Sequence, residues 1–337
     1  MTKVLLTGGS GFIAAHILNL LLEHGHNVIT TVRSDEKASK IKAALESTAS
    51  SRLDFKIIED IAQPGAFDEA LKIEGLEVVI HTASPFQLNV KDVKKDLLDP
   101  AIIGTQGILT AIKKYAPSVK KVIITSSFAA IIDVNKATDD PTVVYTEKSW
   151  NPITESQALE NPALGYRASK TFAERAAWEF IKNEKPNFTI STINPPLVYG
   201  PISHCLNSLD KLNTSNKYIY EIMSGKRKND VLNVRPTLWV DVRDVALAHI
   251  KAFELDEASG KRLFVVTGQK SEQDVAEVIR KNFPSLAANL PNLDTAQPKV
   301  DCYKYDNSDT TAIVGTTQYS FEQSVVDTVK SLQSLGA

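Results

Sequence analysis

Two side chains that could exchange a proton with a substrate lie four residues apart in this sequence, the phenol of Tyr166 and the ammonium of Lys170. On a helix, residues at i and i+4 share one face, so both groups are expected to point into the same cleft. We expect the charge of Lys170 to lower the pKa of Tyr166 from its usual value of about 10. Tyr166 would then be a good proton partner for a reacting oxygen near neutral pH. The same spacing also arises often by chance.

A third candidate, Ser127, follows a predicted strand over residues 121–125. At the end of a sheet strand, its hydroxyl could donate a hydrogen bond to a substrate carbonyl. The alternative is that Ser126 and Ser127 form only a polar turn between strand and loop. A strand-end serine followed along the chain by Tyr166 and Lys170 favours the catalytic interpretation.

The elements that must position these groups begin with the sequence T-G-G-S-G-F-I-A at residues 7–14, between an apolar run and a segment with helical apolar spacing. Gly8 would allow a tight turn, and Gly11 would let the backbone approach a pyrophosphate closely. Ala14 is small enough for the helix to lie near the strand. The phosphates would bind backbone N–H groups at the positive end of this helix. The pattern predicts a dinucleotide-binding βαβ unit.

Arg33 stands at the end of the second predicted strand, and Lys37 follows one helical turn later. In dinucleotide folds this position lies beside the adenosine ribose, where an acidic residue binds the 2′-hydroxyl and an arginine suits a 2′-phosphate. The alternative is that both are solvated surface charges. We predict NADPH rather than NADH as the cofactor. Asp60, after the third predicted strand, is placed to accept a hydrogen bond from the adenine amino group.

Strands alternate with helices over residues 1–193, which predicts an α/β fold with a Rossmann-like, doubly wound parallel sheet. Thr82, Ala83 and Ser84 follow a continuous apolar strand, at the edge where such sheets bind ligands. Beyond Pro196 the pattern changes to a smaller C-terminal α/β substrate lobe. We therefore predict an NADP-binding domain over residues 1–195 and a mainly substrate-binding lobe over residues 196–337, with some return to the main sheet. The predicted strands cover residues 4–6, 28–32, 54–58, 77–81, 121–125 and 188–193, and later 238–240 and 262–266; predicted helices include 66–71, 97–114, 168–181, 205–223 and 242–253.

The composition argues against several classes of function. The 337 residues carry a net charge of −2, so no long-range field favours nucleic acid or an anionic membrane. No apolar stretch approaches the roughly 20 residues that a membrane span needs, and no signal peptide is recognised. The two cysteines have no metal or redox spacing. We expect a cytoplasmic monomer or homodimer that binds a small molecule and no metal.

Taken together, these motifs resemble the extended short-chain dehydrogenases/reductases. Within that superfamily the chain is most similar to the NADPH-dependent methylglyoxal and carbonyl reductases of yeasts, relatives of the plant dihydroflavonol reductases. The resemblance covers nearly the whole chain and rests on residues 7–14, 33–37, 81–86, 125–127, 166–170, 194–201 and 240–246.

The resemblance implies hydride transfer from NADPH to the carbonyl of an aldehyde or ketone. It implies that Ser127 orients the carbonyl, that Tyr166 donates the proton, and that Lys170 tunes Tyr166 and binds the nicotinamide ribose. Phe86 and Phe128 each follow a strand and would wall the substrate pocket, although core packing is an equal alternative. The predicted cofactor-binding residues are Thr7, Gly8, Gly11, Phe12, Ile13, Arg33, Lys37, Asp60, Ile61, Thr82, Ala83, Ser84, Tyr166, Lys170, Pro195 and Val198.

One position departs from the family pattern. Many members carry an asparagine on the helix before the serine strand, where it helps to organise a proton-relay water, and the matching position here is Ile103. An apolar residue there would weaken that relay or leave it to Lys170 and solvent.

Two other functions share these motifs. A nucleotide-sugar epimerase or dehydratase would retain a tightly bound NAD, whereas Arg33 and Lys37 favour an exchangeable NADP. A regulator that senses NADP without turnover would tend to lose the Tyr166 and Lys170 pair, which is intact.

Overall fold

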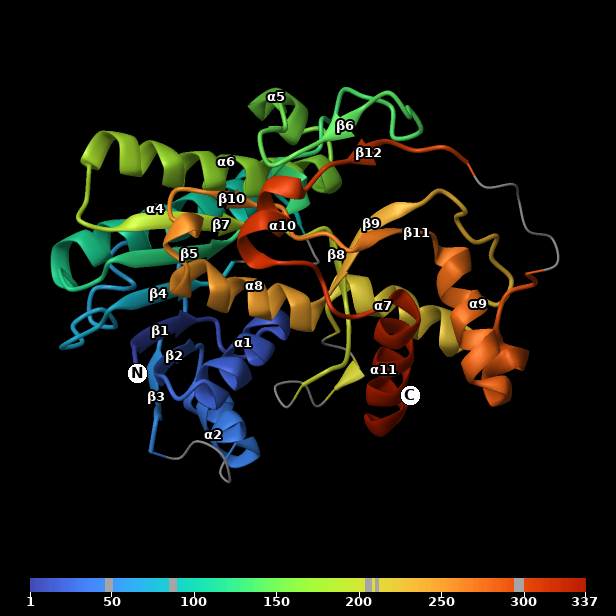
Figure 1. The fold of residues 1–337 in the computed structure, drawn as a ribbon, viewed down its shortest axis with the longest axis horizontal. Coiled ribbons are helices and arrows are strands. Elements are labelled where there is room, and N and C mark those ends of the chain that lie inside the picture. The colour runs from blue at the N-terminus through green and yellow to red at the C-terminus, as the bar shows by residue number, and fades with distance from the viewer. Residues whose placement is uncertain (46–50, 85–89, 204–207, 210–211, 294–299) are drawn as a thin grey trace.

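The computed structural model describes residues 1–45, 51–84, 90–203, 208–209, 212–293 and 300–337. Its centre is a seven-stranded sheet in the order β10-β7-β5-β4-β1-β2-β3, with every neighbouring pair parallel (Figure 1). The order reverses between β1 and β4, which creates the crevice where open α/β sheets bind ligands. The predicted α/β fold with a doubly wound parallel sheet is confirmed. The strands are β1 (Lys3–Thr7), β2 (Asn27–Val32), β3 (Leu53–Ile57), β4 (Val78–His81), β5 (Lys121–Thr125), β7 (Thr189–Ile193) and β10 (Arg262–Leu263).

Helices cover both faces of this sheet. Successive side chains of a strand point to opposite faces, and in β1 Val4 and Leu6 join the core on one face while Leu5 joins the core on the other. The central strands β1 and β4 are therefore buried on both sides, which explains their near-continuous apolar sequences. The first face packs against α1 (Phe12–Glu23), α2 (Asp35–Ala44) and α8 (Val242–Glu254), and the second against α4 (Asp99–Tyr115) and α6 (Pro162–Glu184).

Residues 66–71 and residues 262–266 differ from the sequence-based expectation. Residues 66–71, predicted as a helix, form turns, because so short a segment does not sustain a helix and instead buries Phe67 and Leu71 from a compact loop. The strand predicted over residues 262–266 ends at Leu263. Phe264 continues buried, but its N–H donates to Thr310 Oγ1 at 2.7 Å instead of joining a sheet.

The smaller lobe has its own three-stranded sheet and apolar core, which includes Ile219, Trp239, Ile279 and Val325. The predicted helix over residues 205–223 is shorter, because α7 begins at Thr214; residues 205–207 and 210–211 lie outside the described part of the chain. The elements of this lobe are β8 (Leu197–Tyr199), β9 (Thr237–Asp241), β11 (Gly268–Lys270), α7 (Thr214–Met223), α9 (Glu272–Asn282) and α11 (Phe321–Ser334).

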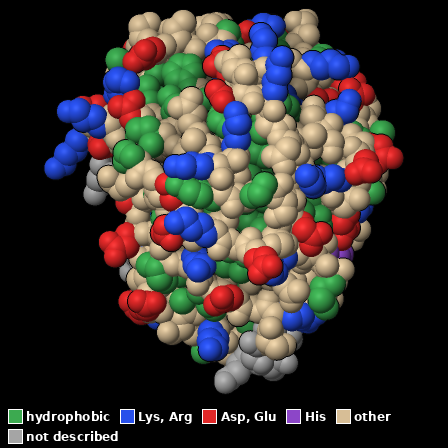
Figure 2. Space-filling model, turned by 90° about the vertical axis from the view of Figure 1, so that its left-hand side faces the viewer, with side chains coloured by type: hydrophobic (Ala, Val, Ile, Leu, Met, Phe, Trp, Pro, Cys, Tyr) green, Lys and Arg blue, Asp and Glu red, His purple; other side chains and the backbone are tan. Residues whose placement is uncertain are grey.

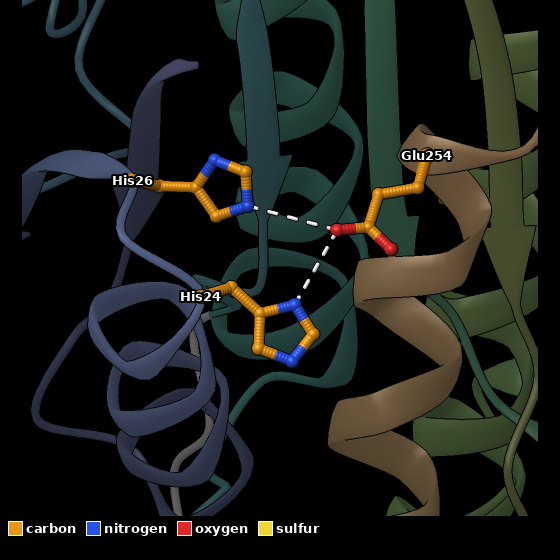
Figure 3. A group of neighbouring side chains, drawn as sticks. All are labelled: His24, His26 and Glu254. Carbon is orange, nitrogen blue, oxygen red and sulfur yellow. Dashed lines mark hydrogen bonds and ion pairs between the residues drawn. The ribbon is translucent and has the colours of Figure 1, made fainter. Parts of the chain in front are cut away.

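The chain after residue 195 also returns to the main sheet, as the sequence allowed. β10 pairs with β7, and α8 packs along α1. Near the ends of these two helices, His24 Nδ1 lies 3.4 Å and His26 Nε2 lies 3.6 Å from Glu254 Oε1 (Figure 3). Elements that follow residue 195 therefore complete the core of the main sheet, and the boundary at residue 195 stays a prediction.

The segment between β5 and α6 carries little regular structure. It contains β6 (Val144–Tyr145), which pairs with β12 (Lys304–Tyr305), and the one-turn helix α5 (Glu155–Ala158); α10 (Ser308–Val314) follows β12. On the face shown in Figure 2, basic and acidic side chains are interspersed. Among the described helices, none has the length and apolar character needed to cross a membrane.

Candidate active site

Hydrogen bonds of side chains connect the end of β1 to the end of β4. Thr7 Oγ1 accepts a hydrogen bond from Ala83 N–H at 3.1 Å and lies 2.9 Å from His81 Nδ1, and Thr82 Oγ1 donates to the Thr7 carbonyl at 2.6 Å. Burial, with the charge of Lys170 as a lesser cause, lowers the pKa of His81 to about 3, so its ring is neutral. The structure thus brings three predicted cofactor residues, Thr7, Thr82 and Ala83, to one edge of the sheet.

The glycine turn after β1 is tight and closely surrounded. Gly8 has a φ of 74°, and a Cβ there would lie 3.1 Å from Ala83 Cα. Gly11 N–H donates a hydrogen bond to the Gly8 carbonyl at 2.8 Å. Sequence reasoning gave no role to Gly9, yet a Cβ at Gly9 would lie 2.1 Å from Thr30 Oγ1 in β2. The pair of adjacent glycines in the sequence could have indicated that the backbone at Gly9 approaches β2 closely.

This turn leads into an uncapped helix start. Gly11 is the N-cap of α1, no side-chain cap is found among the hydrogen bonds of the described residues, and the first turn of the helix holds no acidic residue. The backbone N–H groups and the positive end of the helix dipole are therefore available to an anion, which fits a pyrophosphate. Phe12 and Ile13 lie in this first turn and are half-buried. Their contact with a cofactor stays a prediction.

The residues predicted to bind the adenosine end lie where β2 and β3 finish. Arg33 is exposed at the end of β2, Lys37 lies in the early part of α2, and Asp60 follows β3. Hydrogen bonds from Gln63 and Ala62, with the charge of Arg33 as the smallest cause, hold the pKa of Asp60 below its usual range. The binding of a 2′-phosphate by Arg33 and Lys37 stays a prediction.

The structure brings the three catalytic candidates together. Tyr166 and Lys170 share one face of α6, and Lys170 Nζ lies 5.8 Å from the centroid of the Tyr166 ring. The side chain of Ser127 lies close enough to the Tyr166 phenol to oppose the rise of its pKa. Ser127 is itself fixed, because its Oγ accepts from Ala129 N–H at 3.1 Å where a 3₁₀ turn begins. Their catalytic roles stay predictions.

The electrostatics of this group differ from the expectation. Burial raises the pKa of the Tyr166 phenol, and the hydrogen bond with Ser127 opposes this only in part. Burial also lowers the pKa of the Lys170 amine to about 8. The expectation that the pKa of Tyr166 lies below its usual value is therefore wrong for this structure, because burial outweighs the interaction that lowers it. Both groups are held toward their neutral forms because a buried charge loses its hydration.

A small cavity of about 20 Å³ lies beside Lys170, with room for about one water molecule. Lys170 Nζ donates to Ser84 Oγ at 2.8 Å at its wall, and Ile61 and Thr105 also line it. Ile103 does not line this cavity; its side chain is 41% exposed on α4. Gly104 and Thr105 of α4 line the cavity instead, and the assignment of Ile103 to the relay position stays a prediction.

The other predicted positions lie near the same edge. The Pro195 carbonyl accepts from Phe128 N–H at 2.9 Å, which holds the segment after β7 against the one after β5. Val198 is buried in β8. Their contacts with a nicotinamide stay predictions. Phe86 lies outside the described residues.

Phe128 lies in a buried aromatic cluster. Its ring stacks on Phe264 with centroids 5.4 Å apart and lies 5.5 Å from Tyr145 and 5.8 Å from Tyr303. Only 8% of Phe128 is exposed. This packing supports the core alternative, and it does not support the predicted role of Phe128 as a wall of the substrate pocket.

Sequence reasoning also missed Glu174, which follows Lys170 by four residues on α6. Its side chain is fully buried and pairs with Arg262 at 2.6 Å. Its spacing of four residues from Lys170 could have indicated that Glu174 shares the helical face of Tyr166 and Lys170.

In the part of the chain that the structure describes, one group of side chains has the composition of a metal site. His24, His26 and Glu254 place one ligand atom each within 4.8 Å of one another (Figure 3). His26 Nδ1, however, accepts from Thr2 N–H at 3.3 Å, so the neutral ring carries its proton on Nε2, the atom that faces Glu254. A metal needs a lone pair at that atom, and the other nitrogen of a metal-bound histidine normally donates. We therefore interpret the group as a polar link between α1 and α8.

Comparisons with known proteins agree with this geometry. A model described as the NAD dependent epimerase/dehydratase family matches residues 4–267. The ketoreductase azaE of Aspergillus niger is 46% identical over 98% of this chain and 97% of its own. The putative NADPH-dependent methylglyoxal reductase GRP2 of Candida albicans is 43% identical over 98% of both chains. The solved structure of yeast methylglyoxal/isovaleraldehyde reductase Gre2, complexed with NADPH, is similar with a TM-score of 0.93 and 33% identity over 99% of both chains.

The family match covers most of the chain, and these relatives align along nearly their whole lengths. The likeness to the yeast NADPH-dependent reductases that the sequence predicted is confirmed. The chain therefore belongs to the NAD dependent epimerase/dehydratase family, among the extended short-chain dehydrogenases/reductases.

Proposed function

We propose that this protein is an NADPH-dependent reductase that converts small or aryl aldehydes and ketones to alcohols. The observation that carries the proposal is the meeting of Ser127, Tyr166 and Lys170, with Lys170 Nζ 5.8 Å from the centroid of the Tyr166 ring. This group lies at the carboxyl edge of a parallel sheet, next to a glycine turn and an uncapped helix start. The printed names of the relatives, which are reductases of carbonyl compounds, support the same reaction.

The cofactor would be held by residues at the edge formed by β1, β2 and β4. The glycine turn and the start of α1 suit the pyrophosphate, because Gly8 and Gly9 leave no room for side chains and the helix end favours an anion. Arg33 and Lys37 would bind the 2′-phosphate, and Asp60 the adenine amino group. Further residues proposed to contact the cofactor are Thr7, Gly11, Phe12, Ile13, Ile61, Thr82, Ala83, Ser84, Pro195 and Val198.

The bound cofactor would supply the hydride that adds to the carbonyl carbon. Tyr166 would give its phenolic proton to the carbonyl oxygen, which completes the alcohol. Its raised pKa keeps the phenol protonated until that moment. Ser127 would hold the same oxygen in place. Lys170, with a pKa of about 8, takes up a proton near neutral pH, and its positive charge would stabilise the phenolate that forms.

We propose uncharged carbonyl compounds, such as methylglyoxal and prochiral ketones, as the substrate class. An epimerase or dehydratase of the same family is the second candidate, and it would act on nucleotide sugars with a retained NAD. The two differ in whether added NADPH is consumed. Location in the cytoplasm and a monomeric or homodimeric state also remain proposals.

The test is oxidation of NADPH by the purified protein with a panel of aldehydes, ketones and nucleotide sugars. The variant Tyr166→Phe should lower kcat by about 10²-fold or more while NADPH binding persists, since only the transferable proton is removed. Tyr305→Phe, a half-buried tyrosine outside this group, is the matched control and should keep its activity. Substantial turnover by Tyr166→Phe would contradict the role of Tyr166, and no consumption of NADPH by the unmodified protein would contradict the function.

A further inference from the structure

Glu174 is a buried carboxylate one turn beyond Lys170 and two turns beyond Tyr166 on α6. None of its side chain is exposed on the surface, and it also lines the small cavity beside Lys170. Its two oxygens accept hydrogen bonds from five different side chains. These donors are Ser126 Oγ at 2.5 Å, Asn194 Nδ2 at 2.6 Å, Arg262 Nε at 2.6 Å, Thr192 Oγ1 at 3.1 Å and Trp178 Nε1 at 3.3 Å.

Two of these donors flank Ser127. Ser126 precedes it in the chain, and Asn194 Nδ2 also donates to the Ser127 carbonyl at 3.2 Å. Glu174 is therefore connected to Ser127 by two routes, through the side chain of Ser126 and through the side chain of Asn194. Because Tyr166 and Glu174 belong to the same helix, these hydrogen bonds connect Ser127 to the helix that carries Tyr166.

Arg262 extends the same network to the loop in front of α6. Its guanidinium donates to the carbonyls of Glu147 at 2.8 Å and Ser149 at 2.5 Å, and it lies 3.8 Å from the centroid of the Trp150 ring. Arg262 belongs to β10, next to β7 at the edge of the main sheet (Figure 1). The pair of Glu174 and Arg262 therefore joins α6, the ends of β5 and β7, and the loop in one buried polar cluster.

We propose that Glu174, paired with Arg262, is a positioning residue that sets Ser127 against Tyr166 for carbonyl reduction. The inference rests on the proposed function and deepens it. Glu174 is not placed to touch a substrate, since its oxygens are occupied by five donors. Its effect is geometric, and displacement of a reacting group by about 1 Å can lower a rate by about 10²-fold.

The carboxylate is required because every neighbour of its oxygens is a donor. In Glu174→Gln the amide NH₂ would face Asn194 and Ser126, or Arg262, and at least one buried donor would lose its acceptor. The volume of the side chain hardly changes. This substitution therefore disturbs the alignment of Ser127 without opening a cavity.

The experiment compares Glu174→Gln with Asp244→Asn, a buried acid changed to its amide away from this cluster. Asp244 accepts from Gln318 N–H and Tyr319 N–H and has no contact with Ser127 among the described hydrogen bonds. For both variants we would measure kcat with a carbonyl substrate, the dissociation constant of NADPH and the midpoint of thermal unfolding.

We expect Glu174→Gln to lower kcat by about 10-fold to 100-fold and to leave NADPH binding within about twofold of the unmodified protein. Asp244→Asn should keep its kcat at a comparable loss of thermal stability. Equal losses of kcat in the two variants would overturn the proposal, because general destabilisation would then explain them. A folded Glu174→Gln protein with unchanged kcat would also overturn it.

Ser126→Ala serves if Glu174→Gln does not fold. It removes one donor to Glu174 and should lower kcat by about threefold to tenfold, the effect of one hydrogen bond, with NADPH binding unchanged. Unchanged kcat in Ser126→Ala would overturn the proposal in that case. The two failures are distinguishable, since a wrong positioning role leaves the reductase activity of the unmodified protein and its loss in Tyr166→Phe intact.

Discussion

Replacing Lys170 by methionine is expected to stabilise the fold while it removes activity. Burial lowers the pKa of Lys170 from 10.5 to about 8, so the folded protein disfavours the charged amine. One pKa unit corresponds to 1.36 kcal/mol, and the shift corresponds to a destabilisation of at most about 3 kcal/mol at neutral pH. Methionine has a similar length and carries no charge. We therefore expect Lys170→Met to gain about 1–3 kcal/mol near pH 7, after the loss of the hydrogen bond to Ser84.

The pH dependence gives the sign of this effect. The pKa of Lys170 is lower in the folded chain than in the unfolded chain, so the unfolded chain binds more protons between about pH 8 and pH 10.5. The unfavourable contribution of Lys170 is complete below about pH 8 and disappears as the pH rises toward 10.5. The advantage of Lys170→Met should accordingly shrink by about 2 kcal/mol between about pH 7 and pH 9.5.

The assay is denaturant unfolding of both proteins at these two pH values, with NADPH oxidation measured in parallel. Lys182→Met, an exposed position on the same helix, is the control and should change the free energy of unfolding by less than about 0.5 kcal/mol at either pH. The reasoning is refuted if Lys170→Met is less stable than the unmodified protein near pH 7, or if its advantage does not change with pH.

Three further changes have defined outcomes. Arg33→Ala should raise the KM for NADPH by about tenfold or more and leave that for NADH nearly unchanged, as expected for one charge-assisted contact with a 2′-phosphate; equal losses would show that Arg33 does not bind it. Phe128→Ala should lower the free energy of unfolding by about 3–5 kcal/mol and reduce kcat/KM for an aryl ketone and for methylglyoxal by the same factor, whereas a selective loss for the aryl ketone would restore its role as a pocket wall. Gly9→Ala should impair folding or NADPH binding, because its Cβ would lie 2.1 Å from Thr30 Oγ1, and the added change Thr30→Ala should recover part of the loss if this clash is the cause.

The parts of the fold that depend on local pattern could be predicted from the sequence. The turn at Gly8 and the parallel strands follow from residue types that are close together in the chain, and the structure has both. The meeting of Tyr166 and Ser127 followed from two local rules, helical spacing and strand-end position. The short turns around Phe67 were missed because a few apolar residues have the same spacing in a helix and in a compact loop.

The errors at the site concern properties that depend on distant neighbours. The pKa of Tyr166 depends on how deeply α6 packs, and no spacing within residues 166–170 contains that information. The exposure of Ile103 depends on the rotation of α4 about its axis, which places the next two residues, Gly104 and Thr105, at the cavity and Ile103 at the surface. Phe128 was ambiguous for the same reason, since Phe264 and Tyr303, which enclose it, lie far along the chain.

The return of β10 and α8 to the main sheet has a consequence for how the protein unfolds. Val245 and Ile250 of α8 belong to the core that also contains Ile17 and Leu21 of α1. A chain ended at residue 195 would leave that side of α1 uncovered and the edge of β7 unpaired, so the N-terminal half is not expected to fold by itself. The two lobes should therefore unfold in a single cooperative transition. A ligand held only by the glycine turn would then raise the melting temperature of the entire chain, including helices that never contact it.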